Sequence, residues 1–287
     1  MNNRWFFKKF IIVNSFFLLI ISTIVPNLLI ILLSFTKVQN GEMFNSYFTL
    51  VNFKNVFSPL FITVYINSMI IAIKTVFISI ILGYPVALII YVQNNKYIKY
   101  LLLILIIIPF WTSSLIRTYS MVYLLKLNGV INYYLIYFGI INEPYHMLYD
   151  RNVVIFGFVY NLIPFMIMPI YLSLRKIDKS IIEAAMDLGA SKLQIFFKVI
   201  FPLSYSGVIS GCSMVMLSSF SMFYISDLLG GSKNIMIGNI VKNQILITQN
   251  WNLGSAITVL FYFVVIFWVI VQKKYHKLDL YSDAKNS

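Results

Sequence analysis

Few residues in this 287-residue chain could do covalent or metal chemistry. It has nine acidic residues, two histidines and one cysteine, Cys212. A single cysteine excludes an internal disulfide and a cysteine-based zinc cluster, and His146 and His276 do not have metal-ligand spacing. The sequence has neither GxxxxGK[ST] nor a GxGxxG that opens a helix, so it predicts no nucleotide cradle. We therefore expect no catalytic residue, cofactor or metal in this chain.

The segment IIEAAMDLGASKLQIFFKVIFP, residues 181–202, carries two acids and two lysines between long apolar runs. Glu183 and Asp187 are four residues apart, so they share one face of a helix. Ala184 and Ala185 beside them remove bulk and would let another surface approach closely. This small, acidic face favours a docking element. The alternative is a solvated helix in which Glu183 only caps its own N-terminus.

The same segment carries signals for two short helices. Ser180-x-x-Glu183 predicts a capping box at the first helix, and Gly189 is placed to take the left-handed conformation that ends it. Ser191-x-x-Gln194 predicts a second capping box.

The second helix has an apolar stripe that is formed by Leu193, Phe196, Phe197 and Ile200. Pro202 follows this stripe, and we expect it to let the next helix start in a new direction.

These short helices must be positioned by a membrane-spanning scaffold. The chain is 60% hydrophobic and 11% charged, with a mean hydropathy of +0.85, as is typical of a polytopic membrane protein. A span needs roughly 20 apolar residues. Six segments qualify: residues 10–35, 64–92, 100–123, 153–174, 205–226 and 254–271.

The distribution of basic residues predicts on which side of the membrane each loop lies. Most of the 22 Lys and Arg residues fall at residues 4–9, 96–99, 175–198 and 273–285, so the positive-inside rule puts both termini and the 181–202 segment in the cytoplasm. The net charge of +13 accompanies abundant Asn, Ile, Phe and Tyr. That bias is typical of AT-rich genomes, so we expect contact with membrane lipid and no nucleic-acid partner.

The charged segment resembles a known motif. Glu183-Ala184-Ala185-x3-Gly189, followed by Pro202, is similar to the EAA loop of ABC-importer permeases, although Val199 and Phe201 replace the usual Ile and Leu. In that family the loop faces the cytoplasm and inserts into a groove of an ATPase subunit. The resemblance implies that coupling to an ATPase involves Glu183, Ala184, Ala185, Asp187, Gly189 and Pro202.

Other stretches extend this resemblance over nearly the whole chain. PFWTSSLIR (109–117), LIPFMIMPIY (162–171) and FYISDLLGGSKNIMIGNIV (223–241) look like permeases of bacterial polyamine importers. This implies an all-α membrane protein of six transmembrane helices with the type I ABC importer permease (MetI-like) fold. Its expected parts are a first helix with an external segment (1–63), a five-helix core (64–273) containing the EAA loop (175–204), and a cytoplasmic tail (274–287).

The resemblance also implies an assembly in the bacterial cytoplasmic (inner) membrane. It would contain a second homologous permease as a heterodimer partner, two ATPase subunits that bind ATP and Mg, and an extracytoplasmic polyamine-binding protein. This chain would be a transport subunit and not an enzyme. The alternative is a related importer permease for another small solute, such as ferric iron. An ion-translocating subunit is disfavoured because only Lys74 lies deep enough in a span to join a relay.

A polyamine path needs carboxylates for the ammonium groups and aromatic faces for the charges and methylenes. Asp227 follows Phe223 and Tyr224 at the expected outer end of the fifth span, so it is our first candidate. Its alternatives are an ordinary loop acid or a partner for Arg117. The aromatic candidates are Trp111, Tyr119, Tyr160 and Tyr224, each of which core packing explains equally well. Lys74 would repel the substrate, and we expect it to snorkel or bind lipid.

Overall fold

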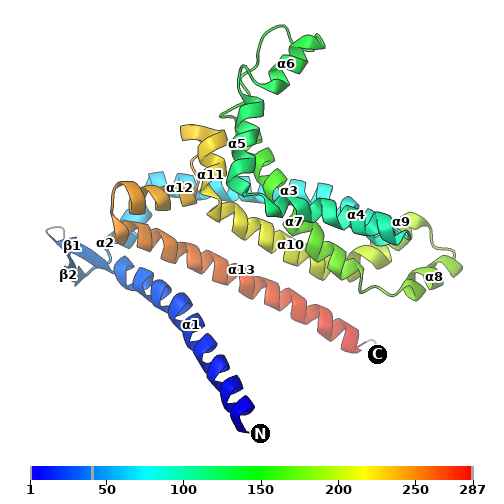
Figure 1. Ribbon diagram of the computed structural model, residues 1–287, viewed down its shortest axis with the longest axis horizontal. Helices are drawn as coiled ribbons and strands as arrows, with labels where there is room; N and C mark the ends of the chain where they lie inside the picture. Colours follow the sequence, from blue (N-terminus) through cyan, green and yellow to red (C-terminus); the bar gives the residue numbers. More distant parts are fainter. Residues whose placement is uncertain (1, 40–41, 286–287) are drawn as a thin grey trace. The chain divides into compact units, whose positions relative to one another are not determined.

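The structure is a computed structural model that describes residues 2–39 and 42–285, and it is almost entirely helical (Figure 1). In chain order the elements are α1 (Asn2–Ser34), β1 (Thr36–Gln39), β2 (Glu42–Phe48), α2 (Val51–Val56), α3 (Pro59–Val92), α4 (Lys96–Ile107), η1 (Ile108–Trp111), α5 (Ser114–Leu125), α6 (Val130–Tyr137), α7 (Arg151–Leu174), α8 (Lys179–Asp187), α9 (Lys192–Ile195), η2 (Phe196–Ile200), α10 (Phe201–Ser221), α11 (Phe223–Ile225), η3 (Ser226–Gly230), η4 (Gly231–Asn234), α12 (Ile237–Lys242), η5 (Asn243–Ile247) and α13 (Trp251–Lys285). Of the η elements, η1 and η4 are 3-10 turns, and η2, η3 and η5 are π-helical.

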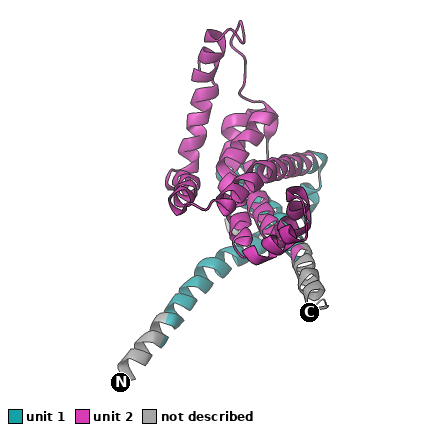
Figure 2. Ribbon diagram, turned by 90° about the vertical axis from the view of Figure 1, so that its right-hand side faces the viewer, with its two compact units in different colours: residues 1–62, 240–270 teal, residues 63–239, 271–287 magenta. Residues whose placement is uncertain are grey.

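The chain divides into two compact units (Figure 2). Unit 1 comprises residues 1–62 and 240–270, and unit 2 comprises residues 63–239 and 271–287. The expected boundaries at 63/64 and 273/274 concern function in the membrane and stay a prediction.

Unit 1 joins the end of α1 to a two-stranded hairpin. β1 and β2 pair antiparallel, with Thr36 opposite Phe48. Two asparagine side chains bond to the last carbonyls of α1: Asn52 Nδ2 donates to Ser34 O (3.1 Å) and Asn252 Nδ2 donates to Leu33 O (3.0 Å). Because these amides satisfy carbonyls that the end of a helix leaves unpaired, they fix where α1 stops and the hairpin begins.

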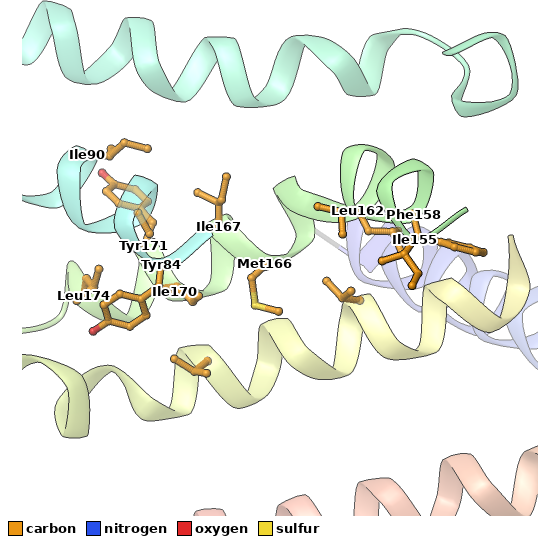
Figure 3. Close-up of a cluster of buried hydrophobic side chains, with 14 of the residues drawn as sticks. Tyr84, Ile90, Ile155, Phe158, Leu162, Met166, Ile167, Ile170, Tyr171 and Leu174 are labelled. Atoms are coloured by element: carbon orange, nitrogen blue, oxygen red, sulfur yellow. The ribbon is translucent and has the colours of Figure 1, made fainter. Parts of the chain in front are cut away.

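The core of unit 2 is built on α7. A stripe of α7 side chains spaced four residues apart is completely buried, and it consists of Phe158, Leu162, Met166, Ile170 and Leu174. Figure 3 shows several of these side chains, with Tyr84 and Ile90 of α3 beside them. Such a stripe lies on one face of a helix, so α7 is the central support of this unit.

Glycines let α10 approach α7 closely. A Cβ on Gly207 would lie 2.6 Å from Pro169 O, and a Cβ on Gly211 would lie 2.8 Å from Met166 Sδ. The Gly-x3-Gly spacing puts both glycines on one face of α10, as in helix pairs that pack within membranes.

The span predictions are confirmed with two corrections. Helices at Ile12–Ser34, Pro59–Val92, Arg151–Leu174, Lys192–Ser221 and Trp251–Ile270 are long and apolar enough to cross a membrane. The third predicted span, 100–123, is broken, since Lys96–Trp111 and Ser114–Tyr137 meet at 91°. Pro109 lies in η1 just before the break, where a residue without an N–H interrupts the helical hydrogen bonds.

The fifth span also differs from the predicted residues 205–226. Its helix begins thirteen positions earlier, at Lys192, and ends at Ser221. Met222 leaves the helical region with ψ of 58°, and the chain continues in α11 and the π-helical η3. Asp227 therefore lies in a separate irregular segment and not at the end of a regular span.

Candidate functional site

The first loop helix, α8, begins two residues earlier than its sequence motif predicted. Asp178 is the N-cap, and its Oδ1 accepts a hydrogen bond from Ser180 N (3.1 Å). The predicted Ser180–Glu183 capping box is wrong, because an aspartate caps as well as a serine and adds a negative charge at the positive end of the helix. Glu183 is exposed, and within the described residues its carboxylate has no hydrogen-bond or ion-pair partner.

Gly189 ends α8 as predicted. Its φ is +78°, and two hydrogen bonds close the turn: Ala190 N donates to Ala185 O (3.1 Å) and Gly189 N donates to Met186 O (2.9 Å). This is the Schellman pattern. Nothing lies within 4 Å of a Cβ built on Gly189, so only the backbone conformation requires glycine there.

The second loop helix, α9, has the predicted capping box. Ser191 N donates to Gln194 Oε1 (2.8 Å), and Gln194 N donates to Ser191 Oγ (3.3 Å). The expected change of direction at Pro202 is wrong, since one helical span runs from Lys192 to Ser221. The π-helical η2 lies just before the proline, and Phe201 N donates to Phe196 O five residues back. This wider turn makes room for a ring that would clash in a regular helix.

The loop helices expose apolar side chains beside the acidic face. Leu188, Leu193 and Phe197 are 89%, 71% and 64% exposed. The predicted apolar stripe is therefore only partly right, because Ile200 is buried and Phe196 half-buried, while Leu193 and Phe197 face outward. Large exposed apolar groups next to charged ones are typical of a protein-binding surface.

The inner side of this loop contacts α3. The Phe196 and Tyr84 rings meet edge to face at 5.6 Å, and the Tyr84 hydroxyl lies 2.8 Å from Ser204 Oγ. Tyr91 Oη donates to Ile177 O (3.4 Å) just before α8. A displacement of the loop helices would therefore move two helices, α3 and α10. Sequence reasoning missed Tyr84 and Tyr91, since nothing in their local pattern indicates a contact with a distant loop.

Three of the predicted substrate-path residues, Asp227, Tyr224 and Tyr160, lie where α5, α7 and α11–η3 pack together, which we call the junction. Asp227 is exposed, and its Oδ1 accepts a hydrogen bond from Asn239 Nδ2. Asn239 Nδ2 also contacts Phe223 O (3.0 Å), and its Oδ1 accepts from Met236 N (2.8 Å). Asn239 thus holds the carboxylate at a fixed place on the surface of unit 2.

Two of the aromatic candidates belong to the junction. The Tyr224 hydroxyl lies 2.6 Å from Ser114 Oγ, which fixes the ring of Tyr224 against α5. The guanidinium of Arg117 lies 6.0 Å from the centre of the Tyr160 ring. Tyr160 therefore already has a cation at its face, which weakens it as a contact for a substrate ammonium.

Asn161 is a polar residue at the junction that sequence reasoning missed. It is 1% exposed, and its Nδ2 donates to Gly157 O (2.9 Å) and Thr118 Oγ1 (3.4 Å). Its Oδ1 and Arg117 Nε are both buried without hydrogen-bond partners in the described chain. An unpaired acceptor inside a span is costly, so it marks a place for a donor. Asparagine is abundant in this chain, which hid the signal.

The other two aromatic candidates take no part in these contacts. Trp111, in η1, is 86% exposed, and Tyr119, in α5, is 55% exposed. Their roles, like those of all the predicted site residues, stay predictions.

The family of the chain follows from its comparison with known proteins. Residues 79–276, which contain α8, α9 and the junction, match the family of binding-protein-dependent transport system inner membrane components. The chain belongs to this family. It is a multi-pass inner-membrane permease.

Two relatives are similar to this permease in sequence over most of its length. The permease is 41% identical over 258 residues to the spermidine/putrescine transport system permease protein PotB of Haemophilus influenzae, which covers 90% of this chain and 89% of the relative. It is 42% identical over 241 residues to the Escherichia coli K12 PotB, with 84% and 87% covered.

Solved structures support the fold. A chain of a bacterial alginate ABC transporter, crystallised with a periplasmic protein bound to alginate pentasaccharide, aligns with a TM-score of 0.74 at 16% identity, covering 94% of this permease and 93% of that chain. A chain of the inward-facing MetNI methionine ABC transporter aligns with a TM-score of 0.57 at 15% identity, covering 77% and 98%. The predicted type I importer permease (MetI-like) fold is confirmed.

Proposed function

We propose that this permease forms part of the membrane path of an ATP-driven importer for polyamines such as spermidine and putrescine. The observation that carries the proposal is the identity of about 40% to spermidine/putrescine permeases over most of both chains. The exposed, fixed carboxylate of Asp227 beside the aromatic junction fits a flexible cation. A ferric-iron permease of the same fold remains the alternative.

The proposed assembly has a second permease as a heterodimer partner, two ATPase subunits and an external polyamine-binding protein. ATP and Mg would bind in the ATPase subunits and not in this chain. Both termini and the loop helices would face the cytoplasm, which agrees with the excess of basic residues there.

In this proposal the outward face of α8 and α9 docks on an ATPase. Glu183 and Asp187 supply carboxylates, and Leu188, Leu193 and Phe197 supply exposed apolar surface. Since Asp178 caps α8, the carboxylate of Glu183 is available to a basic group of the ATPase. Closure of the ATPases on ATP would push this surface, and the contact of Phe196 with Tyr84 would pass the motion to α3.

Coupling requires that ATP and substrate each bind the inward-facing and outward-facing states with different affinity. The face of the loop that docks on the ATPase supplies the difference in affinity for ATP. The junction supplies the difference in affinity for substrate if the carboxylate of Asp227 faces the substrate in only one state.

Replacing Asp227 with Asn tests the substrate. This change keeps the shape of the side chain and removes its charge, so uptake of radiolabelled spermidine should fall about tenfold, the effect of roughly 1.4 kcal/mol. Uptake is measured in cells with equal amounts of each variant in the membrane. Glu143→Gln is the matched control, since Glu143 is an exposed acid outside the junction.

The two substrate hypotheses predict opposite results. A polyamine importer takes up labelled spermidine. Putrescine should lower that uptake by competition, and ferric ion should not. Uptake of ferric ion without uptake of spermidine would replace the polyamine proposal. Unchanged spermidine uptake in Asp227→Asn would remove this carboxylate from the path.

A further inference from the structure

Unit 2 has a cavity whose lining residues differ from the residues described at the junction. It has a volume of about 320 Å³ and lies between α3 and α7. Its polar lining is Lys74 and Asn152. Its apolar lining is Ile78, Leu82, Ile155, Phe156 and Val159. We call this the α3–α7 groove.

Two contacts show that α3 and α7 run parallel beside this groove. At the start of α7, an amino group of Arg151 donates to Asn67 Oδ1 of α3 (3.1 Å). Further along, a Cβ on Gly83 of α3 would lie 3.1 Å from Met166 Cγ of α7. The two contacts are 16 residues apart on α3 and 15 apart on α7, so both helices advance together.

The groove changes from polar to apolar along this common direction. Asn152 is the second residue of α7, and Lys74 is seven residues, or roughly 10 Å, beyond Asn67. Helical side chains lean toward the N-terminus of their helix, so the Lys74 ammonium leans back toward the level of Asn152. Leu82 and Val159 lie further along, toward the middle of the membrane.

Lys74 lacks a partner for its charge. Within the described residues, the ammonium of Lys74 has no hydrogen-bond or ion-pair partner, and the same holds for the side-chain amide of Asn152. A cation within a span is costly unless it reaches the interface or meets an opposite charge. α7 is 24 residues long, roughly 36 Å, so its first turn lies near the edge of a hydrocarbon core of about 30 Å. The Lys74 stem leans toward that edge.

We propose that the α3–α7 groove binds an anionic phospholipid of the surrounding membrane. The headgroup phosphate pairs with Lys74 and accepts a hydrogen bond from the side-chain amide of Asn152, and one acyl chain follows Ile78, Leu82 and Val159 toward the middle of the membrane. The groove has a polar end and an apolar end, as a phospholipid has a polar headgroup and apolar acyl chains. The positive charge of Lys74 favours a phospholipid with a net negative charge. This binding does not depend on which solute the permease transports.

The test is native mass spectrometry of the full-length permease, purified in mild detergent with any subunits that accompany it and titrated with phosphatidylglycerol. Lys74→Met should weaken phosphatidylglycerol binding about fivefold, the effect of one lysine on attraction to anionic lipid. Lys74→Arg should retain binding, because it keeps the charge. Lys54→Met is the matched control, since Lys54 is an exposed lysine of unit 1, and it should leave binding unchanged.

A second variant examines the acyl-chain end. Leu82 is 48% exposed, so Leu82→Trp can fill the groove without entering the core, and it should also weaken phosphatidylglycerol binding. Unchanged binding in Lys74→Met overturns the proposal. So does displacement of the lipid by glycerol phosphate with no effect of Leu82→Trp, which would indicate a site for free phosphate. Loss of a co-purifying permease from Lys74→Met would assign Lys74 to a subunit interface instead.

Discussion

Gly189 carries the sharpest requirement in the loop, and that requirement is purely conformational. Its φ of +78° places it in the left-handed region, while nothing lies within 4 Å of a Cβ built on it. Larger side chains therefore fit in volume but strain the backbone. Asp178 is the opposite case, because its side chain and not its backbone defines where α8 begins.

We predict that uptake by variants of Gly189 depends on how readily the new residue adopts the left-handed backbone conformation, and not on the size of its side chain. Gly189→Asn should retain most uptake, whereas Gly189→Val should lose it, because a β-branched residue costs roughly 1–2 kcal/mol or more in this region. Both variants should reach the membrane in normal amounts. Uptake and co-purification of the ATPase are the measurements, and Ala190→Val is the neighbouring control. Normal uptake by Gly189→Val would refute a role for this turn in coupling.

Among the elements, α7 and α10 pack against each other more extensively than any other pair of helices described in unit 2. Their axes approach because Gly207 and Gly211 present no side chains to α7. α10 continues from α9 through η2 without a break, so the close packing makes α7 a support against which motion of the loop acts.

Filling this helix contact should destabilise the protein. On Gly207, a side chain would begin 2.5 Å from Ser173 Cβ and 2.6 Å from Pro169 O, neither of which can move without its helix. We expect Gly207→Leu to cost about 2 kcal/mol or more through overpacking. Thermal unfolding in detergent, followed by tryptophan fluorescence, measures the loss. Ser210→Leu, at an exposed position of the same helix, should change the melting temperature little, and an equal fall in both variants would contradict this account.

For the molecule as a whole, the proposed function requires a particular orientation in the membrane. The loop helices must face the ATPases in the cytoplasm, and the loop before α7 must lie on the opposite side of the membrane, if the permease works as proposed. The chain is convenient for a test because Cys212 is its only cysteine.

Labelling from outside the cell should separate the two sides. In a Cys212→Ser background, Glu143→Cys should react with a membrane-impermeant maleimide in intact cells, because its loop carries few basic residues. Lys192→Cys, on α9, should react only after permeabilisation. Both positions are exposed, so burial does not account for a difference. The reverse pattern would place the loop helices outside and exclude docking on a cytoplasmic ATPase.

Features that depend on neighbours in sequence were predictable from sequence. The apolar runs indicated the spans because bilayer thickness sets their length. The Ser191–Gln194 box and the left-handed Gly189 were predictable because their hydrogen bonds close within a few residues. Ser180 shows the limit even at short range, since Asp178 competed for the same helix start and formed the cap.

Features that join distant parts of the chain were decided only by the tertiary structure. Asn239 holds Asp227, Tyr224 contacts Ser114, and Tyr84 contacts Phe196. No local pattern specifies such pairs, because each depends on how whole helices pack against one another. The apolar spans, apart from the break in the third and the earlier start of the fifth, and the turn between the loop helices thus follow from the sequence by itself. The carboxylate's place beside the aromatic junction, and the inner contact of the loop with α3, exist only once the helices are packed.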